Sequence, residues 1–99
     1  MPTSIGVVRT DAPARYAKQL LSHLGHKVQV EEVDGVPDGG RLVFAYGAGV
    51  VRPQADELLL EAVAPDAESL ARVEDVLARH LLRFGRRDEL TVSWRRAAD

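Results

Sequence analysis

The chain has 99 residues, of which 45% are hydrophobic, and its 13 basic and 15 acidic side chains give a formal net charge of −2. This length predicts a single domain, residues 1–99, with one core. The absence of cysteine excludes disulfides, thiolate metal sites and cysteine nucleophiles. The small net charge predicts no general nucleic-acid binding and no attraction to an anionic membrane. Without a signal-peptide pattern or an apolar run of about 18 residues, we expect a cytoplasmic protein.

The first two expected elements are a strand over 3–10 and a helix. The strand is rich in β-branched residues and centres on Ile5, Val7 and Val8. Asp11 followed by Pro13 predicts a helix that begins at Ala12, with Asp11 as its N-cap. Gly25 is expected to end this helix. Its apolar stripe is Tyr16, Leu20 and Leu24, flanked by Ala17 and Leu21.

Alternating valines after the first helix predict a half-buried antiparallel strand with one wet face. They are Val28, Val30 and Val33. The acidic, glycine-rich segment 34–40 is typical of a hairpin loop, and 41–46 follows as a third strand.

The next segments predict one or two further strands. Residues 47–49, Gly-Ala-Gly, are expected to form a tight turn or bulge, with the start of another strand at 50–52. Segment 53–56 interrupts that strand, and 57–62 forms the next one, which ends before Pro65.

A second, longer helix is expected between Asp66, its N-cap, and Gly85, its C-cap. Its apolar stripe is Leu70, Val73, Leu77, Leu81 and Phe84, with Val76 and His80 on the edge. Residues 90–94 alternate strictly and predict a last strand, followed by a frayed tail over 95–99.

This order predicts an α+β fold, a two-layer sandwich in which two helices cover one face of a mainly antiparallel sheet. The order is β-α-β-β-β-α-β, with room for one extra strand. The opposite sheet face stays open to solvent, to a ligand or to a second copy, so a homodimer through this face is one expectation.

Three blocks of the sequence resemble the small bacterial domains catalogued as domain of unknown function 2218. The first runs from Arg15 to Val28 through His23-Leu24-Gly25-His26, the second from Ala64 to Val76, and the third from His80 to Trp94. The family has no defining activity. Because such domains are sometimes fused to siderophore-interacting flavoproteins, the resemblance implies an accessory role in iron metabolism and a flavoprotein of that kind as partner.

The three histidines are the candidate ligands for a metal or cofactor. His23 lies beside the apolar stripe of the first helix, His26 follows Gly25, and His80 lies on the second helix. Neutral imidazole binds iron, zinc, copper and haem, so His23, His26 and His80 predict such a site. The alternative is structural: His23 and His80 pack at the helix–sheet interface, and His26 caps helix carbonyls.

An enzyme reading has weaker support in the sequence. Its candidate pairs are His23 with Ser22 or Tyr16, and His80 with Glu74 or Asp75, none of which has a recognised spacing. We therefore expect a small accessory or binding domain with a histidine-based site. A homodimerisation module without a ligand is the alternative, and a small enzyme acting on an unknown metabolite is the third interpretation.

Overall fold

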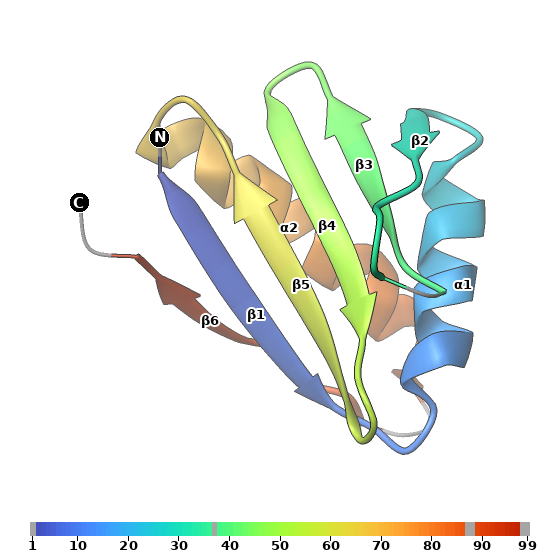
Figure 1. Ribbon diagram of the computed structural model, residues 1–99. Coiled ribbons are helices and arrows are strands. Elements are labelled where there is room, and N and C mark those ends of the chain that lie inside the picture. Colours follow the sequence, from blue (N-terminus) through green and yellow to red (C-terminus); the bar gives the residue numbers. More distant parts are fainter. Residues whose placement is uncertain (1, 37, 87–88, 98–99) are drawn as a thin grey trace.

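The chain folds into a six-stranded sheet with two helices packed on one of its faces (Figure 1). A computed structural model describes residues 2–36, 38–86 and 89–97. In chain order the elements are β1 (Thr3–Arg9), α1 (Pro13–Leu24), β2 (Gln29–Glu31), β3 (Gly40–Phe44), β4 (Gly47–Pro53), β5 (Glu57–Val63), α2 (Ala67–Phe84) and β6 (Ser93–Arg96).

The sheet has the order β2-β3-β4-β5-β1-β6, and every neighbouring pair is antiparallel. The expected α+β class, the two layers and the extra strand are confirmed. The first strand lies inside the sheet and the last strand pairs beside it, where the amide of Ala97 donates to the carbonyl of Thr3 at 3.0 Å. No helix in the described parts of the chain is long and apolar enough to cross a membrane.

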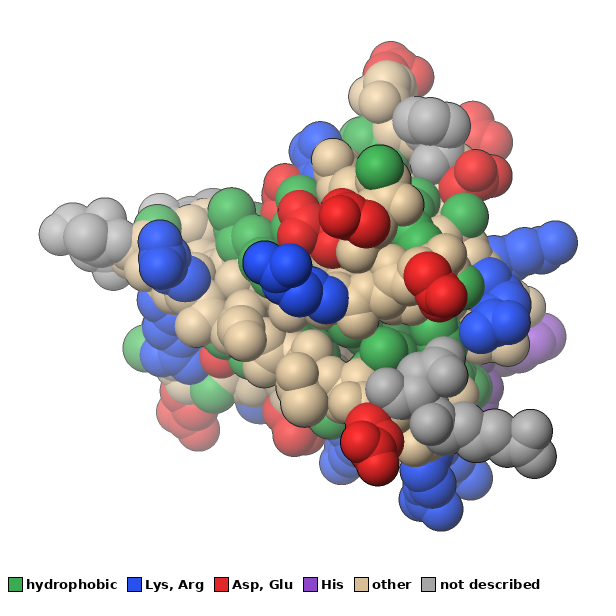
Figure 2. All heavy atoms as spheres, turned by 90° about the horizontal axis from the view of Figure 1, so that it is seen from below, with side chains coloured by type: hydrophobic (Ala, Val, Ile, Leu, Met, Phe, Trp, Pro, Cys, Tyr) green, Lys and Arg blue, Asp and Glu red, His purple; other side chains and the backbone are tan. Residues whose placement is uncertain are grey.

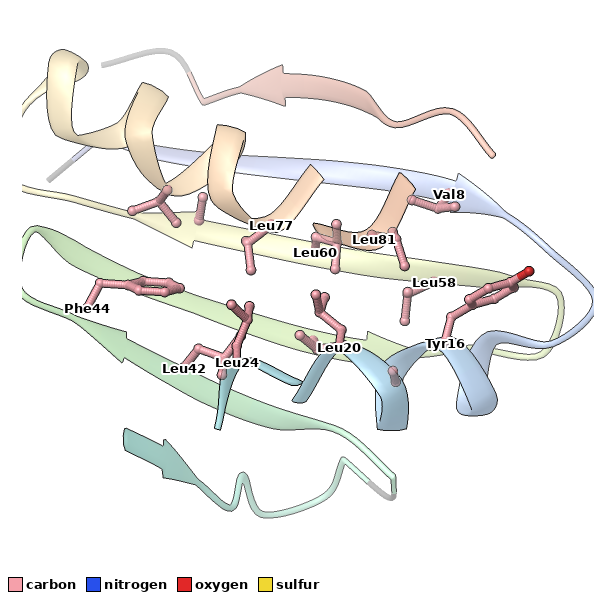
Figure 3. Packing of buried hydrophobic residues seen from close by; sticks show 14 of the residues in the cluster. Val8, Tyr16, Leu20, Leu24, Leu42, Phe44, Leu58, Leu60, Leu77 and Leu81 are labelled. Atoms are coloured by element: carbon pink, nitrogen blue, oxygen red, sulfur yellow. The ribbon is translucent and has the colours of Figure 1, made fainter. Parts of the chain in front are cut away.

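The core fills the space between the helices and the sheet (Figure 3). Leu20 and Leu24 of α1 and Leu77 and Leu81 of α2 point toward Leu42, Leu58 and Leu60 of the strands. All seven side chains are buried. Full burial of one such side chain contributes roughly 1.5 to 3 kcal/mol, so these stripes explain why both helices share one sheet face.

The two helices begin in different ways. At α2 the expected cap is confirmed, because the Asp66 carboxylate accepts from the amide of Ser69 at 2.7 Å. At α1 the expectation of an Asp11 cap is wrong. Ala12 is the N-cap residue and makes no side-chain cap bond, while its amide donates to the Thr10 hydroxyl at 3.1 Å. The Thr10 hydroxyl thus accepts from the amide of the N-cap residue, and no side chain caps the amides of the first helical turn.

The glycine-rich segment 47–49 is part of β4, and the expectation of a turn there is wrong. The turn lies two residues earlier, at Ala45 and Tyr46, and Phe44 pairs with Gly47. The position of α2 explains why glycine occupies position 49. A Cβ on Gly49 would lie 2.9 Å from Leu77 Cδ1, so the missing side chain lets α2 approach the sheet closely.

Strand β1 lies second from one edge of the sheet and turns alternate residues toward the helices. Ser4, Gly6 and Val8 face the helices, and Ile5 and Val7 face the open side. Strand β2 is also shorter than expected, with Val28 and Val33 outside it, because it pairs with β3 over only three residues.

The last strand begins at Ser93, three residues later than expected. Leu90 and Val92 precede the strand and pack against the core. The expected frayed tail over 95–99 is wrong for Arg95 and Arg96, which pair with β1. The tail expected at Ala98 and Asp99 lies outside the described residues.

Candidate metal site between the two helices

Two of the three candidate histidines meet where α1 and α2 pack together. His23 lies three residues after the buried Leu20, and His80 lies three residues after the buried Leu77. Helical periodicity therefore puts each imidazole at the edge of its helix's buried stripe. Since both helices pack on the same sheet face and contact each other, these two edges face one another.

The rings of His23 and His80 are in contact. Their centres lie 5.2 Å apart and their planes are tilted by 44°. Phe84 packs against His23 with the two rings nearly perpendicular, their centres 5.3 Å apart and their planes 79° apart. The pair is thus half-buried, with an aromatic wall on one side.

A backbone hydrogen bond orients His80. Its Nδ1 lies 2.8 Å from the carbonyl oxygen of Val76, one helical turn earlier. Because that oxygen can only accept, we assign the proton to Nδ1, which leaves the Nε2 lone pair free when the ring is neutral. Metal-binding histidines in proteins commonly show this arrangement, in which one nitrogen donates to a carbonyl and the other coordinates.

The charges around His23 are positive. The pKa of His23 is lowered from its ordinary value, first by burial of the ring and then by the charge of His80, Lys27, Arg83 and His26. The imidazole is therefore neutral at physiological pH and keeps a lone pair available. Among the residues that the structure describes, no carboxylate contributes to the pKa shift of this ring, so the pair offers two nitrogen donors without a negative charge beside His23.

The third histidine lies apart from this pair. His26 lines an open hollow beside α1 together with Leu21, Val30 and Asp38. Within the described residues there is no group of three or more histidine, aspartate or glutamate side chains able to hold one metal ion. The structure thus brings together His23 and His80 of the expected set and leaves His26 outside.

The acid–base pairs considered for an enzyme are not brought together around His80. The Glu74 carboxylate pairs with Arg96 at 2.8 Å, and Asp75 lies 3.7 Å from Arg79 on the same helix. On α1, Tyr16 is buried in the core beneath the Arg15 guanidinium, and Ser22 is exposed beside His26.

Sequence reasoning missed a second feature, a hollow of about 740 Å³ on the open sheet face between β1 and β6. Ile5 lies in its wall and is 47% exposed, the largest exposed fraction of the prominent hydrophobic side chains. The available signal was the alternation of Ser4 and Gly6 with Ile5 and Val7. Two small residues on one side of a strand indicate that something packs closely there, which leaves the larger side chains on the other side.

Comparison with known proteins agrees with this fold. The sequence pattern of a family described as an uncharacterized protein conserved in bacteria (DUF2218) matches residues 6–95. The NMR structure of PA4090 from Pseudomonas aeruginosa is 34% identical, superposes with a TM-score of 0.78, and the match covers 96% of each chain. No curated protein matches the sequence. The chain therefore belongs to the bacterial family DUF2218.

Proposed function

We propose that this small bacterial domain is a binding domain whose ligand is a transition-metal ion held by His23 and His80. The observation that carries the proposal is the 5.2 Å separation of the two ring centres. Two imidazoles that bind one tetrahedral ion with bonds of about 2.0 to 2.1 Å place their ring centres about 5 Å apart. The pair thus needs little rearrangement to share an ion.

The protonation states support the same proposal. The lowered pKa of His23 keeps its ring neutral, and the Val76 carbonyl holds the His80 proton on Nδ1. His23 can therefore present a lone pair without first losing a proton, and the orientation of His80 leaves its Nε2 available to an ion. Imidazole suits zinc, ferrous iron, copper and nickel, and Phe84 shields one side of the site from water.

The spacing favours a single ion over a haem held between the two rings. Two histidines on opposite sides of a haem iron have ring centres more than about 6 Å apart. The observed 5.2 Å is shorter, so the haem alternative requires the helices to separate.

The proposed link to iron metabolism rests on the fusion of some such domains to siderophore-interacting flavoproteins. Ferrous iron is therefore one of the ions to test, and a siderophore-interacting flavoprotein is the candidate partner. To test this partner, the flavoprotein is added to the isotope-labelled domain, and binding should shift the backbone amide NMR signals of the domain.

The metal site is tested by titrating the purified domain with Zn²⁺, Ni²⁺ and, without oxygen, Fe²⁺. An ion present at about 100 times its dissociation constant stabilises the fold by about 2.7 kcal/mol, enough to raise Tm by about 10 °C or more. The variants His23→Gln and His80→Gln should each weaken binding by at least about tenfold, since one of two ligands is lost.

The matched control is His26→Gln, which removes the nearby histidine that lies outside the pair. It should bind the ion as the wild type does. A wild type whose Tm does not respond to any of the three ions contradicts the proposal, and so does a His26 variant that loses as much affinity as the other two. Circular dichroism of each variant checks that the fold is retained.

A further inference from the structure

The open sheet face carries one continuous row of side chains that crosses all six strands. Each neighbour in the row is a direct cross-strand partner of the next. From β2 to β6 the row reads Glu31, Arg41, Val50, Glu61, Ile5, Arg95. It therefore begins with an acid at one edge of the sheet and ends with a base at the other.

Charges inside the row are already paired within the chain. Glu61 lies 2.9 Å from Arg52 on the neighbouring strand, and Arg41 lies 3.9 Å from Glu31. Arg95 at the far edge makes no ion pair among the described residues. Because Glu31 is itself the partner of Arg41, the excess negative charge at the β2 edge comes from Glu32, Asp34 and Asp38 beside it, and Arg95 gives the β6 edge its positive charge.

The space-filling view shows basic side chains on several sides of the molecule and the acidic ones most concentrated in one place. In Figure 2, basic side chains lie at the left, on the side of β6 in Figure 1. Asp and Glu side chains gather on the lobe at the top, over the segment that joins β2 to β3.

Apolar side chains occupy much of the middle of this face. Ile5 is 47% exposed at the hollow between β1 and β6. The half-buried members are Val7, Val43, Ala48, Val50, Leu59 and Val63. A sheet face with an apolar centre and a charged rim is typical of a protein interface.

We propose that a second copy of this chain covers the open face, in a two-fold dimer whose axis runs parallel to the strands. Such an axis exchanges the two edges of the sheet, so Glu31 of each copy lies opposite Arg95 of the other. Ile5 of one copy then faces Arg41 of the other, whose methylene stem can cover it. No like charges within the row meet in this arrangement.

The alternative two-fold axis, which runs along the row across the strands, is disfavoured by the same charges. It would place every side chain of the row opposite its own copy. Four charged residues, Glu31, Arg41, Glu61 and Arg95, would each face a like charge, which is destabilising. Charge complementarity therefore selects the strand-parallel axis.

The size of the face suits a stable dimer. Six strands at about 4.8 Å spacing and about 20 Å in length present roughly 500 to 600 Å² in projection. The accessible surface of such a face is larger than its projection, and a standard interface buries about 800 Å² on each partner. The metal site lies on the other face of the sheet. The dimer proposal and the metal proposal can therefore be tested independently of each other.

The dimer is tested by sedimentation equilibrium on the full chain. Ile5→Arg should raise the dimer dissociation constant by roughly 30-fold or more, because it places a second positive charge opposite Arg41 of the other copy and removes an apolar contact. The matched control is Leu82→Arg, since Leu82 is 37% exposed but lies on α2, away from the open face. This control should dimerise as the wild type does.

A charge exchange tests the axis. Arg95→Glu alone and Glu31→Arg alone should each raise the dissociation constant about tenfold, because two copies of the repulsive pair arise in each dimer. The double variant restores opposite charges at both ends and should recover the wild-type constant. A monomeric wild type, loss of the dimer in Leu82→Arg, or no recovery in the double variant would each overturn the proposal.

Discussion

The carboxylate of Glu74 on α2 accepts hydrogen bonds from the guanidinium of Arg96 on β6, at 2.8 Å from Nη2 and 3.4 Å from Nε. This two-point contact ties the last strand to the helix layer. The side chain of Glu74 is only 13% exposed, whereas that of Arg96 is 47% exposed. The pair is therefore only partly screened by water, and bidentate geometry adds to its strength.

We expect Glu74→Gln to lower the free energy of unfolding by about 0.5 to 1 kcal/mol, since the amide keeps the shape but loses the charge. Urea unfolding followed by circular dichroism measures the change. The matched control is Asp75→Asn, because its pair with Arg79 is about two-thirds exposed on both sides and should contribute almost nothing. If Glu74→Gln and Asp75→Asn lowered the free energy of unfolding equally, the Glu74–Arg96 pair would not be the stronger of the two.

The same pair makes the stability depend on pH. Burial by itself would raise the pKa of Glu74, but hydrogen bonds from Arg96 and Ser4 and the charge of Arg96 outweigh it and lower the pKa. Because the folded pKa is depressed, the stabilisation is complete above the unfolded value of about 4.3 and is lost as pH falls through the folded pKa. The difference between wild type and Glu74→Gln should therefore be largest at neutral pH and vanish in acid.

The two helix starts predict unequal effects of the same substitution. Asp66→Ala should lower the free energy of unfolding by about 1 kcal/mol, because the Ser69 amide loses its acceptor. Asp11→Ala should leave it nearly unchanged, since α1 has no side-chain cap and Asp11 is exposed. Thermal unfolding of the two variants compares them directly, and a larger loss at Asp11 would refute this account of the helix starts.

Trp94, the single tryptophan, reports on how the last strand packs. Its ring lies over Gly6, where a Cβ would approach two of the ring carbons to 2.9 Å. Gly6→Ala should therefore displace the indole, shift its fluorescence emission to the red and cost about 1 to 3 kcal/mol of stability. Ile5→Ala changes the neighbouring residue on the opposite face and should leave the emission maximum in place. An unchanged emission maximum in Gly6→Ala would contradict the close packing of the Trp94 ring on Gly6.

Local patterns were sufficient to predict the helices. The caps at Asp66 and Gly85 and the leucine stripe of α2 depend on residues within one or two turns of each other, so the sequence contains the whole signal. The same reasoning failed at Gly49. There the conformation depends on Leu77, a residue of α2 that comes to the sheet only in the folded chain.

The candidate site was also predictable from local sequence only in part. The three-residue spacing of His23 from Leu20 and of His80 from Leu77 was enough to place each histidine at an interface. The distance between them depends on how α1 crosses α2, which no local pattern encodes. The start of β6 at Ser93 depends in the same way on its pairing with β1. Because the sequence does not show that β1 is the partner, the polar residues Arg95 and Arg96 were predicted to lie in a frayed tail.

The pairing of β1 with β6 has a consequence for how this domain can be joined to others. The amide of Ala97 bonds to the carbonyl of Thr3, so the chain enters and leaves the fold at one corner. A unit built this way can be inserted into a surface loop of a larger protein without forcing the two sides of that loop apart. In such an arrangement the host would be tethered next to Thr3 and Ala97, and the far edge of the sheet at β2 would remain free.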